Sequence, residues 1–193
     1  MKRNKIAAQG GFSLIELLVA LTLLSVLAVA ITGAFDGSRS RAQSLLSMMS
    51  ELGSAQARQK NDTGCYVNTP LALYDMAKGR DLSQNYCGRA QTKTWNGPYV
   101  SRFTANATGE VVADKIAEGV LVSFQRETGG MGKRYYTRAV AVPVDVARQF
   151  LQECNNSAEE VTGAAAFETN KCRLQAAIAG ETVGVEMIFD ETR

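Results

Sequence analysis

The N-terminal part of the chain contains an unbroken apolar run, residues 12–35, in which Glu16 is the only charged residue. At about 1.5 Å per residue, a helix over this run is roughly 36 Å long, enough to cross the hydrocarbon core of a membrane. A carboxylate at the centre of such a helix costs roughly 2.5–3.5 kcal/mol on insertion scales. The pattern predicts a membrane-spanning helix and leaves Glu16 to be explained.

The pattern changes after the apolar run. Apolar or amide residues recur at steps of three or four, with polar residues between them, at Ala42, Leu45, Leu46, Met49, Leu52 and Gln56. This spacing indicates an amphipathic helix with one stripe to bury. We expect one continuous helix from Phe12 to about Lys60, apolar all round in its first half and packed on a folded domain in its second half.

The remaining residues predict an α+β head with an antiparallel sheet. Stretches rich in β-branched and aromatic residues predict strands at 119–125, 134–142 and 181–189, with a hairpin loop at 127–133. A short helix is expected at 71–77, and another at 144–153 after a proline. The turn sequence WNGPY at 95–99 contains two aromatic residues. They either anchor a loop to the core or form a platform for a ligand.

Composition argues against most enzyme chemistry. The 193-residue chain contains no histidine, which is the commonest general base and transition-metal ligand. No nucleophile–base pair and no D-x-D-x-D-G calcium loop stands out in the sequence. We therefore expect no enzyme activity, no catalytic residue, no metal site and no cofactor. The acidic residues are scattered, as on a solvated surface, at Asp62, Asp75, Asp81, Glu110, Asp114, Glu118, Glu127, Asp145, Glu153, Glu159 and Glu160.

The net charge of +2 is concentrated at the N-terminus. Lys2, Arg3 and Lys5 lie within the first eleven residues, which contain no acid, and their removal leaves a side-chain charge of −1. The remaining surface has no basic excess that would indicate nucleic-acid binding. Basic residues before an apolar helix hold the N-terminus in the cytoplasm, so the head is expected outside it.

Three interpretations of the N-terminal segment compete. A cleavable secretory signal could end at Ala28-Val29-Ala30, but its apolar part is shorter than this run and is not interrupted by a charge. A plain membrane anchor accounts for the length and orientation and leaves Glu16 unexplained. The third interpretation is a resemblance. Residues 11–17, GFSLIEL, after a short basic leader, resemble the class III signal of type IV pilins and pseudopilins.

This resemblance implies that a prepilin peptidase cuts after Gly11 and methylates the new amino terminus at Phe12. The chain then divides into a leader (1–11), a transmembrane and filament-core half-helix (12–35), an amphipathic half-helix (36–60) and a head (61–193). It also implies a type IV pilin-like α+β fold. In that fold the hydrophobic half of a long N-terminal helix protrudes, the amphipathic half packs on an antiparallel sheet, and a disulfide bounds the C-terminal region.

Processing would supply the missing partner of Glu16. Cleavage creates an ammonium group at Phe12, and two opposite charges brought together in a low-dielectric setting offset much of their separate desolvation costs. The family resemblance implies that Glu16 of one subunit pairs with the Phe12 amine of its neighbour. That contact would set the register of subunits during assembly.

Whether the four cysteines form disulfides depends on the compartment in which the chain is expected to lie. An exported chain with an even set and no C-x-x-C pair suggests two disulfides, and a zinc site is the weaker alternative. Cys65 and Cys87 bracket a loop whose closure would be worth about 3 kcal/mol in the chain-entropy model. Cys154 and Cys172 match the C-terminal disulfide loop of many pilins. The first pair departs from the best-known major pilins.

The expected function is that of a structural subunit of a type IV pilus, as a major or a minor pilin. Its implied partners are other pilin subunits, the prepilin peptidase and an inner-membrane assembly platform. It would sit in the inner membrane with its head in the periplasm, and then in a filament on the cell surface. One alternative is a pseudopilin of a type II secretion system. A remote alternative is a membrane-anchored periplasmic enzyme or binding protein.

Overall fold

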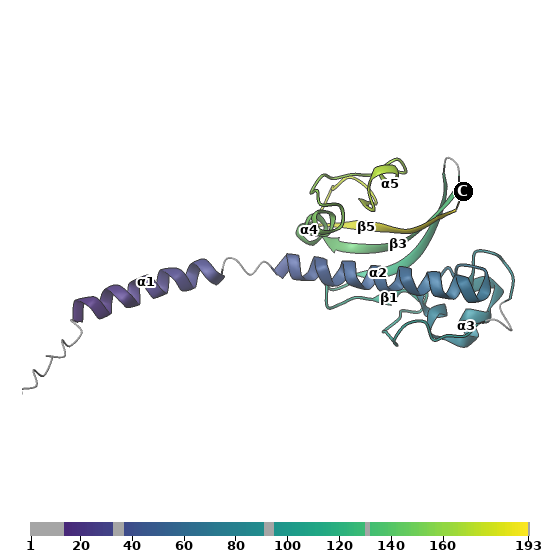
Figure 1. Ribbon diagram of the computed structural model, residues 1–193, viewed down its shortest axis with the longest axis horizontal. Helices are drawn as coiled ribbons and strands as arrows, with labels where there is room; N and C mark the ends of the chain where they lie inside the picture. The colour runs from purple at the N-terminus through teal and green to yellow at the C-terminus, as the bar shows by residue number, and fades with distance from the viewer. Residues whose placement is uncertain (1–13, 33–36, 91–94, 130–131, 193) are drawn as a thin grey trace, which may run out of the picture. The chain divides into compact units, whose positions relative to one another are not determined.

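The computed structural model describes residues 14–32, 37–90, 95–129 and 132–192 (Figure 1). It divides into two compact units, one that contains helix α1 and one that comprises Ser38–Arg193. The second unit contains both disulfides and a five-stranded antiparallel sheet. The α+β class expected from the sequence is therefore confirmed, with the N-terminal helix and disulfide-bounded C-terminal region of a pilin-like fold.

Helix α1 (Leu14–Thr32) forms over the apolar run. Its large apolar side chains in the first half are each more than half exposed: Leu14, Ile15, Leu17, Leu18, Val19, Leu21 and Leu23. The expected span of residues 12–35 extends past both ends of α1 into positions outside the described residues. Among the described residues, no helix is both long enough and apolar enough to cross a membrane.

Helix α2 (Gly37–Thr63) carries the predicted amphipathic stripe. Ala42, Leu45, Met49, Leu52 and Gln56 are buried, whereas Leu46 is half-buried. The helix ends where Gly64 adopts a left-handed conformation (φ 75°) and donates its N–H to the Lys60 carbonyl over 2.7 Å. The continuity expected between the two helix halves, which meet at residues 35 and 36, stays a prediction because residues 33–36 lie outside the described residues.

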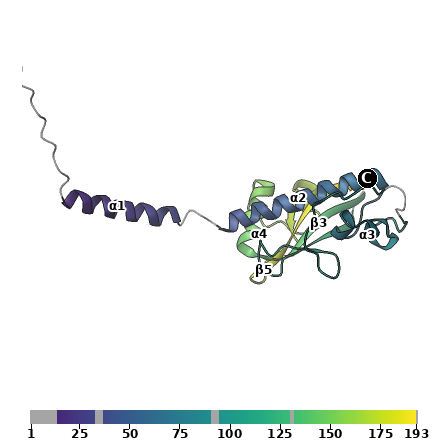
Figure 2. The ribbon, with the colours of Figure 1, turned by 90° about the horizontal axis from the view of Figure 1, so that it is seen from below.

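The sheet has the strand order β1-β2-β3-β5-β4, and every neighbouring pair is antiparallel (Figures 1 and 2). The strands are β1 (Val111–Val112), β2 (Leu121–Gly129), β3 (Gly132–Pro143), β4 (Cys172–Leu174) and β5 (Thr182–Thr192). The three predicted strands correspond to β2, β3 and β5. Strands β1 and β4, each only two or three residues long, were not predicted.

The predicted hairpin loop at 127–133 is wrong in extent. Glu127 pairs with Arg134, Thr128 with Lys133 and Gly129 with Gly132, so the ladder continues through most of the segment. The glycines that suggested a flexible loop are compatible with a strand when the partner strand supplies regular pairing. Only Gly130 and Met131, which lie outside the described residues, separate the two strands.

Helix α2 lies along one face of the sheet (Figures 1 and 2). Alternate strand residues contribute to the core on this face, for example Phe124, Ala139 and Met187. A Cβ added at Gly53 would approach the Cβ of Phe189 to 2.8 Å, so α2 and β5 are closely packed here. Helix α4 (Val144–Asn155), at the position predicted, adds Val146, Ala147, Phe150 and Leu151 to the same core.

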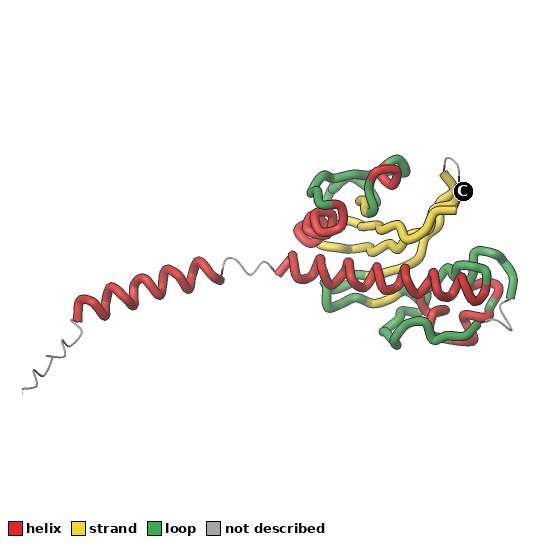
Figure 3. Tube along the Cα trace, in the orientation of Figure 1, coloured by secondary structure: helices red, strands yellow, loops and turns green. Residues whose placement is uncertain are grey.

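The segment after α2 is mostly loop, with short helical turns (Figure 3). In place of the predicted helix at 71–77 there are two pieces, the 3-10 helix η1 (Pro70–Leu73) and helix α3 (Met76–Arg80). They are separate because the Asp75 side chain accepts hydrogen bonds from the N–H groups of Ala77 and Lys78 and so starts a new helix. A further 3-10 turn, η2 (Leu82–Gln84), follows.

The two aromatic residues of the WNGPY turn anchor it to the head. Trp95 is 7% exposed and donates its indole N–H to the Ala72 carbonyl over 3.1 Å. Its ring contacts that of Tyr99 edge to face, and the Tyr99 hydroxyl donates to Asp62. These contacts favour the anchoring interpretation over a ligand platform.

Candidate functional site

The N-terminal motif is described only from its fourth residue onward. The predicted cleavage and methylation positions, Gly11 and Phe12, lie outside the described residues. Glu16 is in the first turn of α1 and is exposed. The structure therefore places Glu16 on a helix among exposed apolar side chains, and its pairing with a Phe12 amine stays a prediction.

Both predicted cysteine pairings are present. Cys65 is bonded to Cys87 and Cys154 to Cys172, with a Cα–Cα distance of 6.1 Å in each case. Each disulfide closes one region of the head, the Cys65–Cys87 region and the Cys154–Cys172 region. One follows α2, and the other joins the end of α4 to β4.

The Cys65–Cys87 region is attached to α2 by a buried amide. Gln56 donates its side-chain N–H to the Val67 carbonyl over 2.7 Å and accepts the Val67 N–H over 3.2 Å. The Gln56 side chain thus satisfies both backbone groups of Val67, as a residue of a neighbouring strand would do. This explains why a polar residue continues the buried stripe of the helix.

The last turn of α2 is joined to β5 by three polar side chains. Lys60 lies 2.8 Å from a carboxylate oxygen of Asp190, and the Tyr66 hydroxyl donates to that same oxygen. Burial acts to raise the pKa of Asp190, but the hydrogen bonds from Lys60 and Tyr66 outweigh it and hold this pKa below its ordinary value. The hydrogen bond to Asp190 raises the pKa of Lys60, and burial raises that of Tyr66 to about 12.

The Cys154–Cys172 region lies on the opposite side of β3 and β5 from α2 (Figures 1 and 3). It contains the short helix α5 (Ala166–Thr169). Many of its side chains or backbone positions are exposed, namely Glu159, Glu160, Thr162, Gly163, Ala164, Ala165, Glu168 and Thr169. Two residues of the region itself, Ala166 and Phe167, are buried. The region therefore presents an exposed outer side over an apolar and charged inner side.

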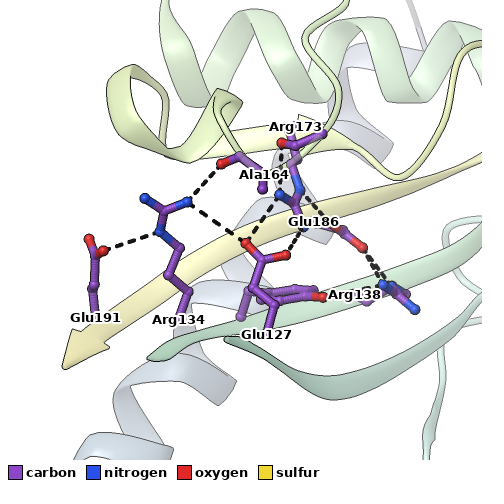
Figure 4. A network of polar contacts seen from close by, with 9 residues as sticks. Glu127, Arg134, Arg138, Ala164, Arg173, Glu186 and Glu191 are labelled. Atoms are coloured by element: carbon purple, nitrogen blue, oxygen red, sulfur yellow. Dashed lines mark hydrogen bonds and ion pairs between the residues drawn. The ribbon is translucent and has the colours of Figure 1, made fainter. Parts of the chain in front are cut away.

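Beneath this region lies a network of arginine and glutamate side chains from four neighbouring strands, β2, β3, β5 and β4 (Figure 4). Arg173 on β4 is 6% exposed and bonds Glu186 on β5 over 2.5 Å and Glu127 on β2 over 2.9 Å. Arg138 on β3 bonds the other oxygen of Glu186 over 2.6 Å. Each carboxylate oxygen of Glu186, which is 1% exposed, thus has a guanidinium partner.

The network extends along β3. Arg134 bonds Glu191 over 3.2 Å and lies 4.0 Å from Glu127 and 3.9 Å from Glu168. The expectation that Glu127 is an isolated surface acid is therefore wrong, because strand pairing places it against two arginines. A partial clue was present in the sequence, since Arg134 and Arg138 share one face of a predicted strand.

The charged network has no features of a catalytic or metal centre. Its carboxylates are occupied by arginines, which leaves them poorly placed to act as bases or ligands. Within the described ranges, no group of three or more histidine, cysteine, aspartate or glutamate residues could hold a metal ion. What the arrangement does chemically is to neutralise buried charge and attach a loop to a sheet.

Comparison with known proteins gives one match. The family described as carrying a prokaryotic N-terminal methylation motif matches residues 6–32. No curated protein and no solved structure matches the chain. The matched segment includes Gly11, Phe12, Glu16 and all of α1. The chain thus carries the class III signal motif of the type IV pilin and pseudopilin family.

Proposed function

We propose that this protein is a structural subunit of a type IV pilus. The observation that carries the proposal is the N-terminal methylation motif at residues 6–32 in the same chain as a folded, disulfide-bonded head. The motif accounts for processing and assembly, and the head supplies the filament exterior. No catalytic residue is assigned.

In this proposal a prepilin peptidase removes residues 1–11 and methylates Phe12. The mature subunit is held in the inner membrane through residues 12–35, with the head (61–193) in the periplasm and the amphipathic half-helix, 36–60, packed on it. The basic residues before the apolar run support this orientation. An inner-membrane assembly platform then transfers the subunit from the membrane into the filament on the cell surface.

Transfer out of a membrane requires a second apolar environment for α1. Its large side chains in the first half are exposed on all sides, so neighbouring apolar helices must replace lipid as their surroundings. Glu16 pairs with the Phe12 amine of a neighbouring subunit and sets the register between them. The pair offsets the desolvation of both charges.

The outer side of the Cys154–Cys172 region is proposed to form part of the filament surface. The two disulfides favour a pilus subunit, because disulfides persist in a head that remains outside the cell. The matched motif also occurs in pseudopilins, so a subunit of a type II secretion pseudopilus is the alternative.

Processing tests the proposal most directly. The full chain is co-expressed with a prepilin peptidase and its intact mass is measured. We expect loss of residues 1–11 together with the gain of one methyl group. Gly11→Val should block the mass change, whereas the neighbouring variant Gly10→Ala should be processed as usual. Recovery of the unprocessed chain in the presence of an active peptidase would overturn the proposal.

Assembly distinguishes the pilus from the pseudopilus. The processed subunit is expressed with the assembly platform of a type IV pilus or with that of a type II secretion system, in cells that lack their own major subunit. Incorporation into long surface filaments only with the pilus platform supports the proposal. Incorporation only with the secretion platform supports the alternative.

A further inference from the structure

The ends of the Cys154–Cys172 region are joined by hydrogen bonds as well as by the disulfide. The Asn155 side chain donates to the Cys172 carbonyl over 2.8 Å and accepts the Cys172 N–H over 2.9 Å. Two residues further along β4, the Leu174 N–H donates to the Val161 carbonyl over 2.9 Å. These contacts close the loop without passing through either sulfur atom.

The middle of the loop is bound to the sheet by two guanidinium groups (Figure 4). Arg173 donates to the Gly163 carbonyl over 2.8 Å, and Arg134 donates to the next carbonyl, that of Ala164, also over 2.8 Å. The guanidinium carbon of Arg173 lies 3.9 Å from the ring centroid of Phe167. The loop thus has two polar anchors and one cation–π anchor on the sheet.

The carboxylates of the network orient these two arginines. Glu186 and Glu127 bond three nitrogens of Arg173, which leaves an Nη1 hydrogen directed at Gly163. Glu191 bonds the Nε of Arg134, so its Nη1 is available to Ala164. Because the arginines come from β3 and β4 and are bound by glutamates on β2 and β5, their positions depend on the sheet.

We propose that Arg134 and Arg173 form a guanidinium clasp that holds the Cys154–Cys172 region in its folded place whether or not the disulfide is formed. The disulfide then locks a loop whose ends already lie together. In a chain with both cysteines replaced, the outer side of the region keeps its shape. This inference concerns the head alone and does not depend on filament assembly.

Hydrogen exchange of the full chain in detergent micelles tests the clasp. Amide exchange is followed by mass spectrometry in peptides from 156–171, where Phe167, Glu168 and Asn170 donate backbone hydrogen bonds. In the double variant Cys154→Ala/Cys172→Ala we expect exchange within about threefold of the parent. In Arg134→Lys and Arg173→Lys, which keep the charge and lose the fork geometry, we expect exchange on the order of tenfold faster in this loop.

Arg148→Lys is the matched control. Arg148 also bonds a residue of this loop, Glu160, over 3.0 Å, but it does so at the exposed surface. Its exchange should resemble that of the parent. Two results would overturn the clasp. One is amide exchange in the cysteine variant that is as fast as in the arginine variants. The other is amide exchange in the arginine variants that is no faster than in Arg148→Lys. If Arg173→Lys does not fold, Arg134→Lys decides, since it removes the Ala164 anchor and the contacts of Arg134 with Glu127, Glu168 and Glu191 but leaves both ion pairs of Glu186 in place.

Discussion

The two long helices of this protein differ in what covers their apolar residues. In α2, one stripe is buried against the sheet of the same chain, and the other faces are polar. In the first half of α1, apolar side chains are exposed around the whole helix. Side chains of the same kind therefore stabilise the head in one helix and are exposed in the described part of the other.

This difference indicates that folding and assembly can be separated by mutation. Substitutions in the buried stripe of α2 should change the free energy of unfolding of the head. Substitutions in the described part of α1 should leave that quantity unchanged and affect processing, membrane association or assembly.

The largest effect is expected at Glu16. Glu16→Ala should lower incorporation into filaments on the order of tenfold or more, because the amine of a neighbouring Phe12 would be left without its counter-charge. Incorporation is measured as the fraction of subunit recovered in sheared filaments. The thermal unfolding of the head should not change. Glu51→Gln, an exposed acid on α2, is the control and should assemble normally. Normal incorporation of Glu16→Ala would contradict the pairing.

Leucines on the two helices provide a matched pair. Leu45 on α2 is fully buried, and Leu45→Ala should lower the free energy of unfolding by about 2–5 kcal/mol through lost burial and the resulting cavity. Leu17 on α1 is 55% exposed, and Leu17→Ala should change the free energy of unfolding by less than about 0.5 kcal/mol. Denaturant unfolding measures both. Equal losses would show that α1 is part of the folded core.

A second matched pair uses glycines of α2. Gly53→Ala places a Cβ 2.8 Å from the Phe189 Cβ, and the overpacking should cost about 1–3 kcal/mol of unfolding free energy. Gly37 has nothing within 4 Å of an added Cβ, so Gly37→Ala should be neutral or stabilise by up to about 1 kcal/mol. A stabilising effect of Gly53→Ala would contradict this prediction, because helix propensity would then outweigh the contact with β5.

The smallest effect is expected from pH, at the Lys60–Asp190 pair that joins α2 to β5. Since the pKa of Asp190 is lowered in the folded state, its contribution is present above the unfolded pKa and is lost as pH falls below about 4. The pKa of Lys60 is raised in the folded state, so the pH dependence of its contribution to stability runs in the opposite direction. That contribution is lost only as pH rises through alkaline values. Both partners are about one-third exposed, which limits the contribution to about 0.5 kcal/mol.

Asp190→Asn isolates this contribution. The difference in unfolding free energy between the parent and the variant should be constant from about pH 5 to 9 and shrink below about pH 4. A difference that grows toward low pH would have the wrong sign and would exclude the pair as its source.

Long periodic patterns in the sequence were sufficient to predict much of the fold. The stripe of α2, the helix at α4 and the strands β2, β3 and β5 each repeat a burial pattern over many residues. The apolar run with its single acid led to the family motif, because a charge in that setting requires a specific reason. Neither inference needed knowledge of contacts distant in sequence.

The features that were missed depend on such contacts. Strand β4 is only three residues long and exists because β5 pairs with it. In β3, a bulge places Ala141 at φ 59°, and nothing in the local sequence AVAV indicates it. The arginine–glutamate network required the register of four strands, since Glu127, Arg173 and Glu186 are far apart along the chain.

The position of β5 in the sheet has a consequence for the order of events in biogenesis. This strand comes last along the chain and yet lies inside the sheet, between β3 and β4. Until Thr182–Thr192 has left the ribosome, β3 lacks one neighbour and β4 has no strand partner. The sheet can therefore be completed only once β5 is available, and a chain that lacks β5 would present an open sheet edge.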